Sequence, residues 1–511
     1  MRRKNTKLYF SRFVIIFLSI MLQAFAAWFL IFVLNRTFWA VQTFTTATGV
    51  ILFLAIVNRE QPAAYKVPWI ILFLIFPFAG MMIYITFGNV RVSRKQLKKF
   101  RAVYHENNDE YYGQAEVMKK LEEVGGNGAA MAKYLKSVTS LPVYDDSKTV
   151  YLPTGEEFYK SLQKALLRAE KYIFMEYFII EEGLMWEGIY DILAERIASG
   201  VEVYIMYDDV GSMAKVPAKF YKTLRTDGIN AQVFNKFRPV VSISHNNRDH
   251  RKITVIDGKF GFISGANIAD EYINATHPFG VWRDNAVYIE GRATDSLVRL
   301  FIQLYNMASN KPLEEEKYIY TAHEKYDDGF VFPFGDSPAP ISFDRIGENV
   351  YLDIINRADK YVYITTPYFI VDTNVTEALK CAAKRGVDVR IIVPDIPDKQ
   401  IIYIMSKSFF PSLIDAGVKI YKFKDGFIHA KTFLSDDDVA VVGTINLDFR
   451  SLVHHFECAV WLYKTSSIID LYKDFSQLFD EECELLDKDS AKLKLHERLL
   501  KSLVNLFAPL M

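Results

Sequence analysis

Three long apolar runs without a charged residue occupy most of the N-terminal part of the chain: Phe13–Leu34, Trp39–Val57 and Val67–Gly88. Each approaches or exceeds the roughly 20 residues that a helix needs to cross a bilayer. Pro77 and Gly80 lie inside the third run, and membrane helices tolerate both residue types. The pattern predicts a transmembrane anchor of two or three helices over residues 1–90. A secretory signal is the alternative for the first run, and buried core helices are the alternative for the other two.

Basic residues flank this region on both sides, five between positions 2 and 12 and six between positions 91 and 101. The positive-inside rule favours the cytoplasm for both clusters, yet three spans would separate them. Either one run does not cross, or one cluster lies outside. Because the second cluster is larger, we expect a multi-pass protein of the cell membrane whose body lies in the cytoplasm.

The hydrophobic pattern repeats itself after a polar stretch at 91–141, which is predicted to be a linker with some helix. In each copy a helix leads into an apolar strand, a second helix ends at a glycine before a buried strand, and a third strand follows. The matching segments are 156–180 and 347–371, 192–209 and 378–395, and 224–234 and 413–423. This alternation predicts an α/β sandwich in each half, and we expect the halves to pack about a pseudo-two-fold axis. The predicted units are a first domain at 142–330, a second at 331–488 and a C-terminal amphipathic segment at 489–511.

Both copies close on the same motif, H-x-K-x-x-x-x-D, formed by His250, Lys252 and Asp257 in the first copy and by His429, Lys431 and Asp436 in the second. The apolar residues inside each motif favour a strand, which would place each His and its Lys on one face. A buried His beside a Lys is costly unless an anion lies against them, and a phosphate suits both. Two copies in register with a duplication are a much stronger signal than one.

A short turn follows each motif at the same distance: SGAN ends at Asn267 and GTIN ends at Asn446. Small residues, backbone N–H groups and an Asn amide together suit a phosphate cradle. The alternative interpretation, two surface histidines on exposed strands, explains neither the duplication nor the equal spacing.

Composition excludes several other classes of protein. The 511 residues carry a formal net charge of zero, which argues against nucleic acid as the main partner. The three cysteines are scattered without C-x-x-C spacing, so we interpret them as free thiols in a reducing compartment. No His or Cys pairs show ligand spacing, so the sequence predicts neither a metal site nor a cofactor.

The paired motifs resemble the signature of the phospholipase D superfamily, H-x-K-x4-D-x6-G-[SG]-x-N in duplicate. The second copy fits closely through Gly443, Thr444 and Asn446, whereas Ser264 stands where the family usually has Gly. The apolar N-terminus, the DHRK and GTINLDFRS segments and the final APLM are similar to bacterial cardiolipin synthases in particular. The resemblance covers nearly the whole chain. It implies two tandem phospholipase D-like domains that convert two phosphatidylglycerols into cardiolipin and glycerol, with these lipids as the partners.

That chemistry needs one histidine to attack phosphorus and another to protonate the leaving glycerol and then deprotonate the incoming hydroxyl. By resemblance His250 is the nucleophile and His429 the acid and base, although the near-symmetric sequence does not decide between them. Lys252 and Lys431, with Asn267 and Asn446, are predicted to hold the non-bridging phosphate oxygens.

Each histidine also needs a partner on its other ring nitrogen. Asp284 and Glu457 are the candidates, because both precede a strand-like segment at similar distances past the motifs. The alternative is that they are exposed acids at strand ends. We expect Asp257 and Asp436, although part of the catalytic motif, to hydrogen-bond at strand ends rather than touch phosphate.

Several alternatives remain open from the sequence. Water as acceptor would make the protein a phospholipase, serine would make it a phosphatidylserine-forming enzyme, and a dead scaffold would have little reason to keep both His–Lys pairs. The insert at 235–249 is either a substrate-channel loop or a surface loop. His454 and His455 either line the pocket or pack behind it. The sequence does not indicate an oligomeric state.

Overall fold

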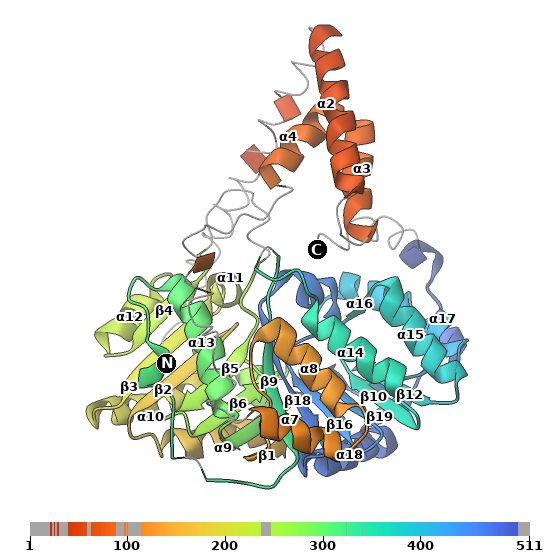
Figure 1. The fold of residues 1–511 in the computed structure, drawn as a ribbon. Helices are drawn as coiled ribbons and strands as arrows, with labels where there is room; N and C mark the ends of the chain where they lie inside the picture. The colour runs from red at the N-terminus through yellow and green to blue at the C-terminus, as the bar shows by residue number, and fades with distance from the viewer. Residues whose placement is uncertain are drawn as a thin grey trace.

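Two large mixed β-sheets form the body of the molecule in the computed structural model (Figure 1). The structure describes residues 21–22, 25, 28–29, 39–58, 63–87, 97–98, 100, 114–236, 247–322, 324–339 and 341–498. The first sheet has the order β1-β8-β6-β5-β2-β3-β4. Its strands are β1 Ser147–Leu152, β2 Tyr172–Tyr177, β3 Glu202–Asp208, β4 Asn230–Phe234, β5 Lys252–Ile256, β6 Phe260–Ser264 and β8 Ala286–Gly291.

The second sheet repeats this arrangement. Its order is β19-β13-β12-β10-β15-β16-β18-β9, which matches the first sheet strand for strand when read from β9, with β19 added at the far edge. Its strands are β9 Phe330–Asp336, β10 Tyr361–Thr365, β12 Asp388–Pro394, β13 Lys419–Phe423, β15 Thr432–Ser435, β16 Val439–Gly443, β18 Glu457–Tyr463 and β19 Cys483–Leu485. The predicted duplication of an α/β unit is therefore confirmed.

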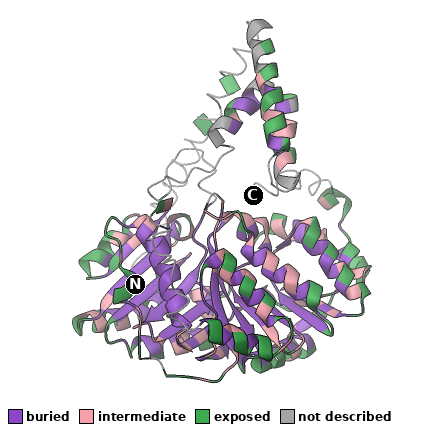
Figure 2. Cartoon of the chain, in the orientation of Figure 1, coloured by how far each residue is buried: buried purple, intermediate pink, exposed green. Residues whose placement is uncertain are grey.

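Helices cover both sheets, with exposed outer faces over strands that are buried along almost their whole length (Figure 2). In the first half they are α9 Gly155–Leu166, α10 Leu184–Ala198, α11 Asp209–Ser212, α12 Phe220–Thr226 and α13 Thr294–Ala308. In the second half they are α14 Ile346–Arg357, α15 Thr373–Lys384, α16 Gln400–Lys407, α17 Phe410–Ile414, α18 Ser467–Gln477 and α19 Lys488–Ala491. Helix α13 is buried on nearly every residue because it packs on strands of the first sheet and on β9 of the second.

Two short ribbons and several isolated bridges complete the described body. Strand β7 (Val281–Arg283) pairs with β14 (Gly426–Ile428) across the two halves, and β11 (Phe369–Ile370) pairs with β17 (Leu447–Asp448) within the second half. A bridge between Asp249 and Phe456 again joins the halves. The remaining turns of helix are η2 Asp270–Ile273, η3 Glu315–Lys317, η4 Arg450–His454 and η5 Leu478–Glu482.

The segment expected to be a linker contributes to the core. Helices α7 (Gln114–Glu123) and α8 (Gly128–Thr139) bury Leu121 and Leu135 completely in the same cluster as the second sheet. Their apolar residues recur at helical spacing, so the helices form where the body offers a surface to cover.

The N-terminal apolar region forms α2 (Trp39–Val57), α3 (Ala63–Ile75) and α4 (Pro77–Phe87), which stand apart from the two sheets (Figure 1). They pack on one another through Ile56, Phe73 and Tyr84. The second predicted run coincides with α2, the third is divided at Phe76, just before Pro77, and most of the first lies outside the described residues. Within the ranges that the structure describes, no helix combines the length and the apolarity needed to cross a membrane.

Candidate active site

The two motif histidines lie at the starts of equivalent central strands. His250 comes just before β5, and His429 comes just before β15. Each strand begins a little later than the sequence pattern predicts, at Lys252 and Thr432, so the histidines lie on the connecting backbone rather than within the strands. Both histidines and both motif lysines are buried.

Each histidine takes its carboxylate from the opposite half of the molecule. His250 Nδ1 lies 2.9 Å from Glu457 Oε2, and His429 Nδ1 lies 2.6 Å from Asp284 Oδ2. The backbone builds both pairs in the same way. The amide of His250 donates to the carbonyl of Phe456, one residue before Glu457, at 2.9 Å, and the amide of His429 donates to the carbonyl of Arg283, one residue before Asp284, at 2.7 Å.

Burial and the neighbouring carboxylates favour one protonation state of each ring. Burial, more than any neighbouring charge, lowers the pKa of His250 to about 3 and that of His429 to about 4, so both imidazoles are neutral at pH 7. A neutral ring whose Nδ1–H donates to a carboxylate carries its lone pair on Nε2. That nitrogen is therefore the one able to attack an electrophile or accept a proton.

The acids themselves stay ionised. Burial by itself raises the pKa of Glu457, but the His250 and His455 rings outweigh it and hold that pKa well below its usual range. Burial likewise raises the pKa of Asp284, while Lys431 and His429 bring it below its usual range.

The two lysines are shifted toward neutrality. Burial lowers the pKa of Lys252 to about 8 and that of Lys431 to about 7. Lys252 Nζ donates to the carbonyl of His250 at 2.7 Å, and Lys431 Nζ lies 2.7 Å from His429 Nδ1. The two ionised acids already balance the charge of the two ammonium groups. What the lysines add for a phosphate is therefore a set of desolvated N–H donors at a fixed position.

The small-residue turns bring two amides and a hydroxyl to the site. Asn267 Oδ1 accepts from the backbone of Ile179 at 2.9 Å, and its Nδ2 donates to Tyr272 Oη at 2.6 Å. Asn446 is buried, and its Oδ1 has no hydrogen-bond partner within the described parts of the chain. Thr444 Oγ1 donates to Glu457, a contact that the sequence did not indicate.

Although Asp257 and Asp436 belong to the motif, their carboxylates lie at the far ends of β5 and β15. Asp257 accepts backbone N–H bonds of 2.8 Å from residues 170, 171 and 172, and Asp436 accepts bonds of 2.8 to 2.9 Å from residues 359, 360 and 361. Both have positive φ, 55° and 56°. These two residues hold the starts of β2 and β10, which agrees with the expectation that they hydrogen-bond at strand ends. Their inclusion among the catalytic motif residues is a prediction for which these contacts give no support.

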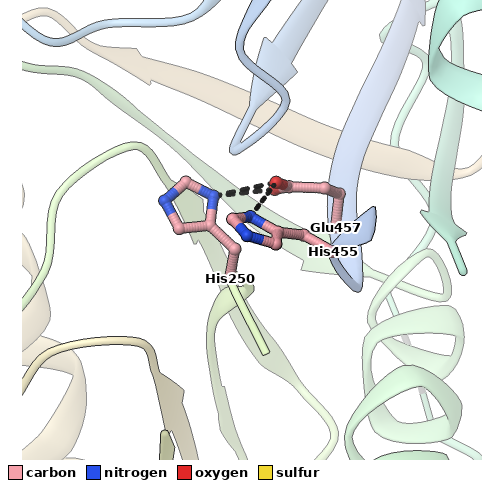
Figure 3. A group of neighbouring side chains, drawn as sticks. All are labelled: His250, His455 and Glu457. Carbon is pink, nitrogen blue, oxygen red and sulfur yellow. Dashed lines mark hydrogen bonds and ion pairs between the residues drawn. The ribbon is translucent and has the colours of Figure 1, made fainter. Parts of the chain in front are cut away.

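His455 lies against the His250 pair (Figure 3). Its Nδ1 is 3.5 Å from Glu457 Oε1, and its ring centre is 5.5 Å from that of His250. One ligand atom from each of His250, His455 and Glu457 fits within 4.8 Å, which is close enough to hold a metal ion. Sequence spacing could not indicate this group, because His250 and His455 lie in different halves.

The corresponding position in the other half is Trp282, which precedes Asp284 by two residues as His455 precedes Glu457. The Trp282 ring centre lies 5.4 Å from that of His429, and Tyr272 and Phe427 lie 5.5 and 5.8 Å from it. Most of the predicted channel loop, residues 237–246, lies outside the described residues.

The body is a duplicated α/β sandwich, and each of its two buried His–Lys–carboxylate groups combines residues of both halves. This arrangement defines the class of protein as phospholipase D-like, and the family models agree. Residues 162–301 and 351–482 match the family model described as "Cardiolipin synthase, PLD-like domain", and residues 48–89 match "Phospholipase_D-nuclease N-terminal". The chain therefore belongs to the cardiolipin synthase family of phospholipase D-like proteins.

Similar proteins include two relatives named cardiolipin synthase, and a solved structure shares the fold. An uncharacterized protein of Streptococcus mutans is 41% identical over 91% of this chain and 100% of its own length. Cardiolipin synthase of Halalkalibacterium halodurans is 31% identical over 94% of this chain and 96% of its own, and cardiolipin synthase 2 of Bacillus cereus is 34% identical over 91% and 89%. Phosphatidylserine synthase of Haemophilus influenzae shares the fold, with a TM-score of 0.57 and 17% identity over 74% of this chain and 97% of that one.

Proposed function

We propose that the protein is a cardiolipin synthase, a phosphatidyltransferase that uses two phosphatidylglycerols and releases glycerol. The observation that carries the proposal is the crossed pairing of His250 with Glu457 and of His429 with Asp284. It provides two oriented, neutral imidazoles, which is what double displacement at phosphorus needs. Full-length similarity to proteins named cardiolipin synthase identifies the substrate class.

In the first step His250 Nε2 forms a bond to the phosphorus of one phosphatidylglycerol. The bond between phosphorus and the glycerol oxygen breaks, and His429 gives that oxygen a proton. In the second step His429 takes a proton from the hydroxyl of another phosphatidylglycerol, whose oxygen attacks the phosphatidyl-histidine and releases His250. An anionic phosphate beside His429 raises the pKa of this ring above that of the empty site, so the ring can carry the proton.

Lys252 and Lys431, with the amides of Asn267 and Asn446, would stabilise the charge on the non-bridging oxygens. Glu457 and Asp284 hold each Nδ1–H and stabilise the imidazolium or phospho-imidazole that forms. The group of His250, His455 and Glu457 is already joined by hydrogen bonding and an ion pair, and none of these steps needs a metal there.

Similarity to cardiolipin synthases supports association with a membrane, and we propose that α2, α3 and α4 belong to a multi-pass anchor with the catalytic body in the cytoplasm. Ile51, Leu54 and Ile75 of these helices are exposed apolar residues, which suits contact with lipid. We also propose the division into catalytic domains at 142–330 and 331–488 with an amphipathic segment at 489–511, of which residues 499–511 lie outside the described part.

A product assay tests the proposal directly. Purified full-length protein in detergent is given phosphatidylglycerol alone, and lipids and glycerol are quantified by mass spectrometry. Cardiolipin with equimolar glycerol is the expected result. Phosphatidate with glycerol would make the protein a hydrolase, and absence of turnover, including with serine as acceptor, would refute a phosphatidyltransferase.

A further inference from the structure

A cavity of about 570 Å³ opens in the second half of the molecule, lined by residues within 368–370, 399–405 and 448–450. Its volume lies within the range of about 300–1,000 Å³ that is usual for pockets of small ligands. Five of its lining residues are apolar: Ile370, Ile401, Ile402, Met405 and Phe449. We call this cavity the α16 pocket, because helix α16 provides one of its walls.

The α16 pocket is continuous in sequence and in packing with the active site. Asp448, which lines it, follows the motif residue Asn446 by two positions on β17. Strand β11 pairs with β17 and brings Ile370 to the same cavity. A second wall is Tyr368, whose ring contacts Phe427 at 6.4 Å, and Phe427 in turn lies 5.8 Å from His429.

The side chains that line the α16 pocket are complementary to an anionic lipid. Apolar side chains form most of the cavity, and the cationic side chains of Lys399 and Arg450 also border it. Lys399 is largely exposed, with its Nζ 3.5 Å from Asp398, so its charge faces water as well as the cavity. An apolar interior with positive charge at its border fits an acyl chain attached to an anionic phosphate.

Helix α16, which lines the pocket, lies on the side of the body that faces the N-terminal helices α2, α3 and α4 (Figure 1). Ile401 on this helix is 47% exposed although it lines the pocket. An isoleucine half exposed at the edge of an apolar cavity gains most if a hydrocarbon chain covers it.

We propose that the α16 pocket holds an acyl chain of the phosphatidyl group while that group is transferred. The inference rests on the function proposed above. The donor is the better occupant, because its acyl-bearing glycerol is attached directly to the reacting phosphorus. In the acceptor lipid the reacting hydroxyl is separated from the acyl chains by a further glycerol and phosphate. A pocket that is connected to His429 through the rings of Tyr368 and Phe427 is at the distance of an acyl chain on the donor, and therefore suits the donor.

The test compares lipids that differ only in chain length. Rates of cardiolipin formation are measured with dioleoyl and with dihexanoyl phosphatidylglycerol in mixed micelles, using the full-length protein. Ile402→Trp fills the α16 pocket, and Ile401→Glu places a charge at its edge. Ile469→Trp and Ile469→Glu are the matched controls, because Ile469 is an exposed isoleucine on α18 outside the pocket.

We expect each α16 variant to lower the ratio of the dioleoyl rate to the dihexanoyl rate at least fivefold and each control to leave it unchanged. The ratio is insensitive to partial unfolding, since unfolding lowers both rates together. An unchanged ratio in both α16 variants, or an equal fall in the controls, would overturn the pocket. In either case, cardiolipin formation by the unmodified protein would leave the proposed function intact, whereas its absence would count against that function instead.

Discussion

The His250 half-site and the His429 half-site share a backbone frame but differ in what surrounds each ring. In both, a histidine before a central strand receives a carboxylate from the opposite half, and the residue before that acid accepts the histidine's backbone N–H. Around His250 the neighbours include a second imidazole, His455. Around His429 the corresponding neighbour is Trp282.

The two acids also differ in how many side chains they contact. Glu457 interacts with His250, His455 and the hydroxyl of Thr444, whereas Asp284 accepts from His429 and the backbone of Asn285. A carboxylate held by several side-chain donors fixes the ring it faces more firmly. Duplication accounts for the backbone frame that the half-sites share, and the residues that differ between the copies give each histidine its own surroundings. The additional contacts of Glu457 favour His250 as the group that carries the covalent bond.

The largest effects should come from the histidines themselves. His250→Ala removes the nucleophile, and we expect the rate to fall by about 10⁵-fold or more with no labelled phosphatidyl-enzyme after acid quench. His429→Ala removes only proton transfer, so we expect a loss of about 10²–10⁴-fold and label that accumulates. Accumulation in His250→Ala instead would reverse the two roles.

The crossed acids should follow. Glu457→Gln and Asp284→Asn keep the shape of the side chain but remove its charge. We expect each to lower kcat by about 10²–10⁴-fold, because the paired histidine is no longer held with its proton on Nδ1 and no longer has a negative partner when it becomes positive. Pre-steady-state kinetics separates them, since Glu457→Gln should slow formation of the phosphatidyl-enzyme more than its breakdown. Equal slowing of both steps by the two variants would mean that the half-sites are not specialised.

The lysines should set the alkaline limit of activity. A lysine is charged below its pKa, so the ammonium groups that hold the phosphate are present below about pH 7 to 8 and are lost as pH rises through the pKa of Lys431, about 7, and of Lys252, about 8. We expect kcat/KM to fall over that range. Lys431→Arg stays charged and should therefore move the fall of kcat/KM upward toward pH 8. If the fall stays at the same pH in this variant, a group other than Lys431 causes it.

A smaller effect should come from His455. His455→Phe removes the 3.5 Å ion-pair contact with Glu457. Because this contact is longer than a hydrogen bond, we expect a loss of kcat of about tenfold or less. Trp282→Phe, at the matched position beside His429, should lower kcat by about threefold or less. Thermal unfolding of both variants is the control, and a loss of activity that simply tracks a loss of stability would remove His455 from the site.

Chelation should have no effect on the rate. His250, His455 and Glu457 could hold a metal ion, whereas the matched position beside His429 is Trp282, which is not a metal ligand. A metal-dependent reaction would therefore need a metal in the His250 half-site alone. We expect saturating EDTA to leave turnover unchanged in a zwitterionic detergent. A large loss restored by one divalent ion, and insensitive to the lipid-to-detergent ratio, would contradict this.

The sequence predicts the features that repeat, because repetition is visible along the chain. The matched strand orders follow from segments such as 170–180 and 359–371, whose patterns agree. The crossed pairing was not predictable, because it depends on the β7–β14 ribbon and the bridge between Asp249 and Phe456, which join residues far apart in sequence. The role of α7 and α8 was hidden for a similar reason, since a short amphipathic helix looks polar until the surface that it covers is known.

The exchange of carboxylates between the halves also bears on how such a chain can arise. Neither half contains a complete His–acid pair, so one copy alone would have a histidine with no carboxylate and a carboxylate with no histidine. A single-copy precursor could complete the pairs only by associating with a second copy of itself about a two-fold axis. Fusion of the two copies then made the association permanent and allowed a residue such as His455 to change on one side alone.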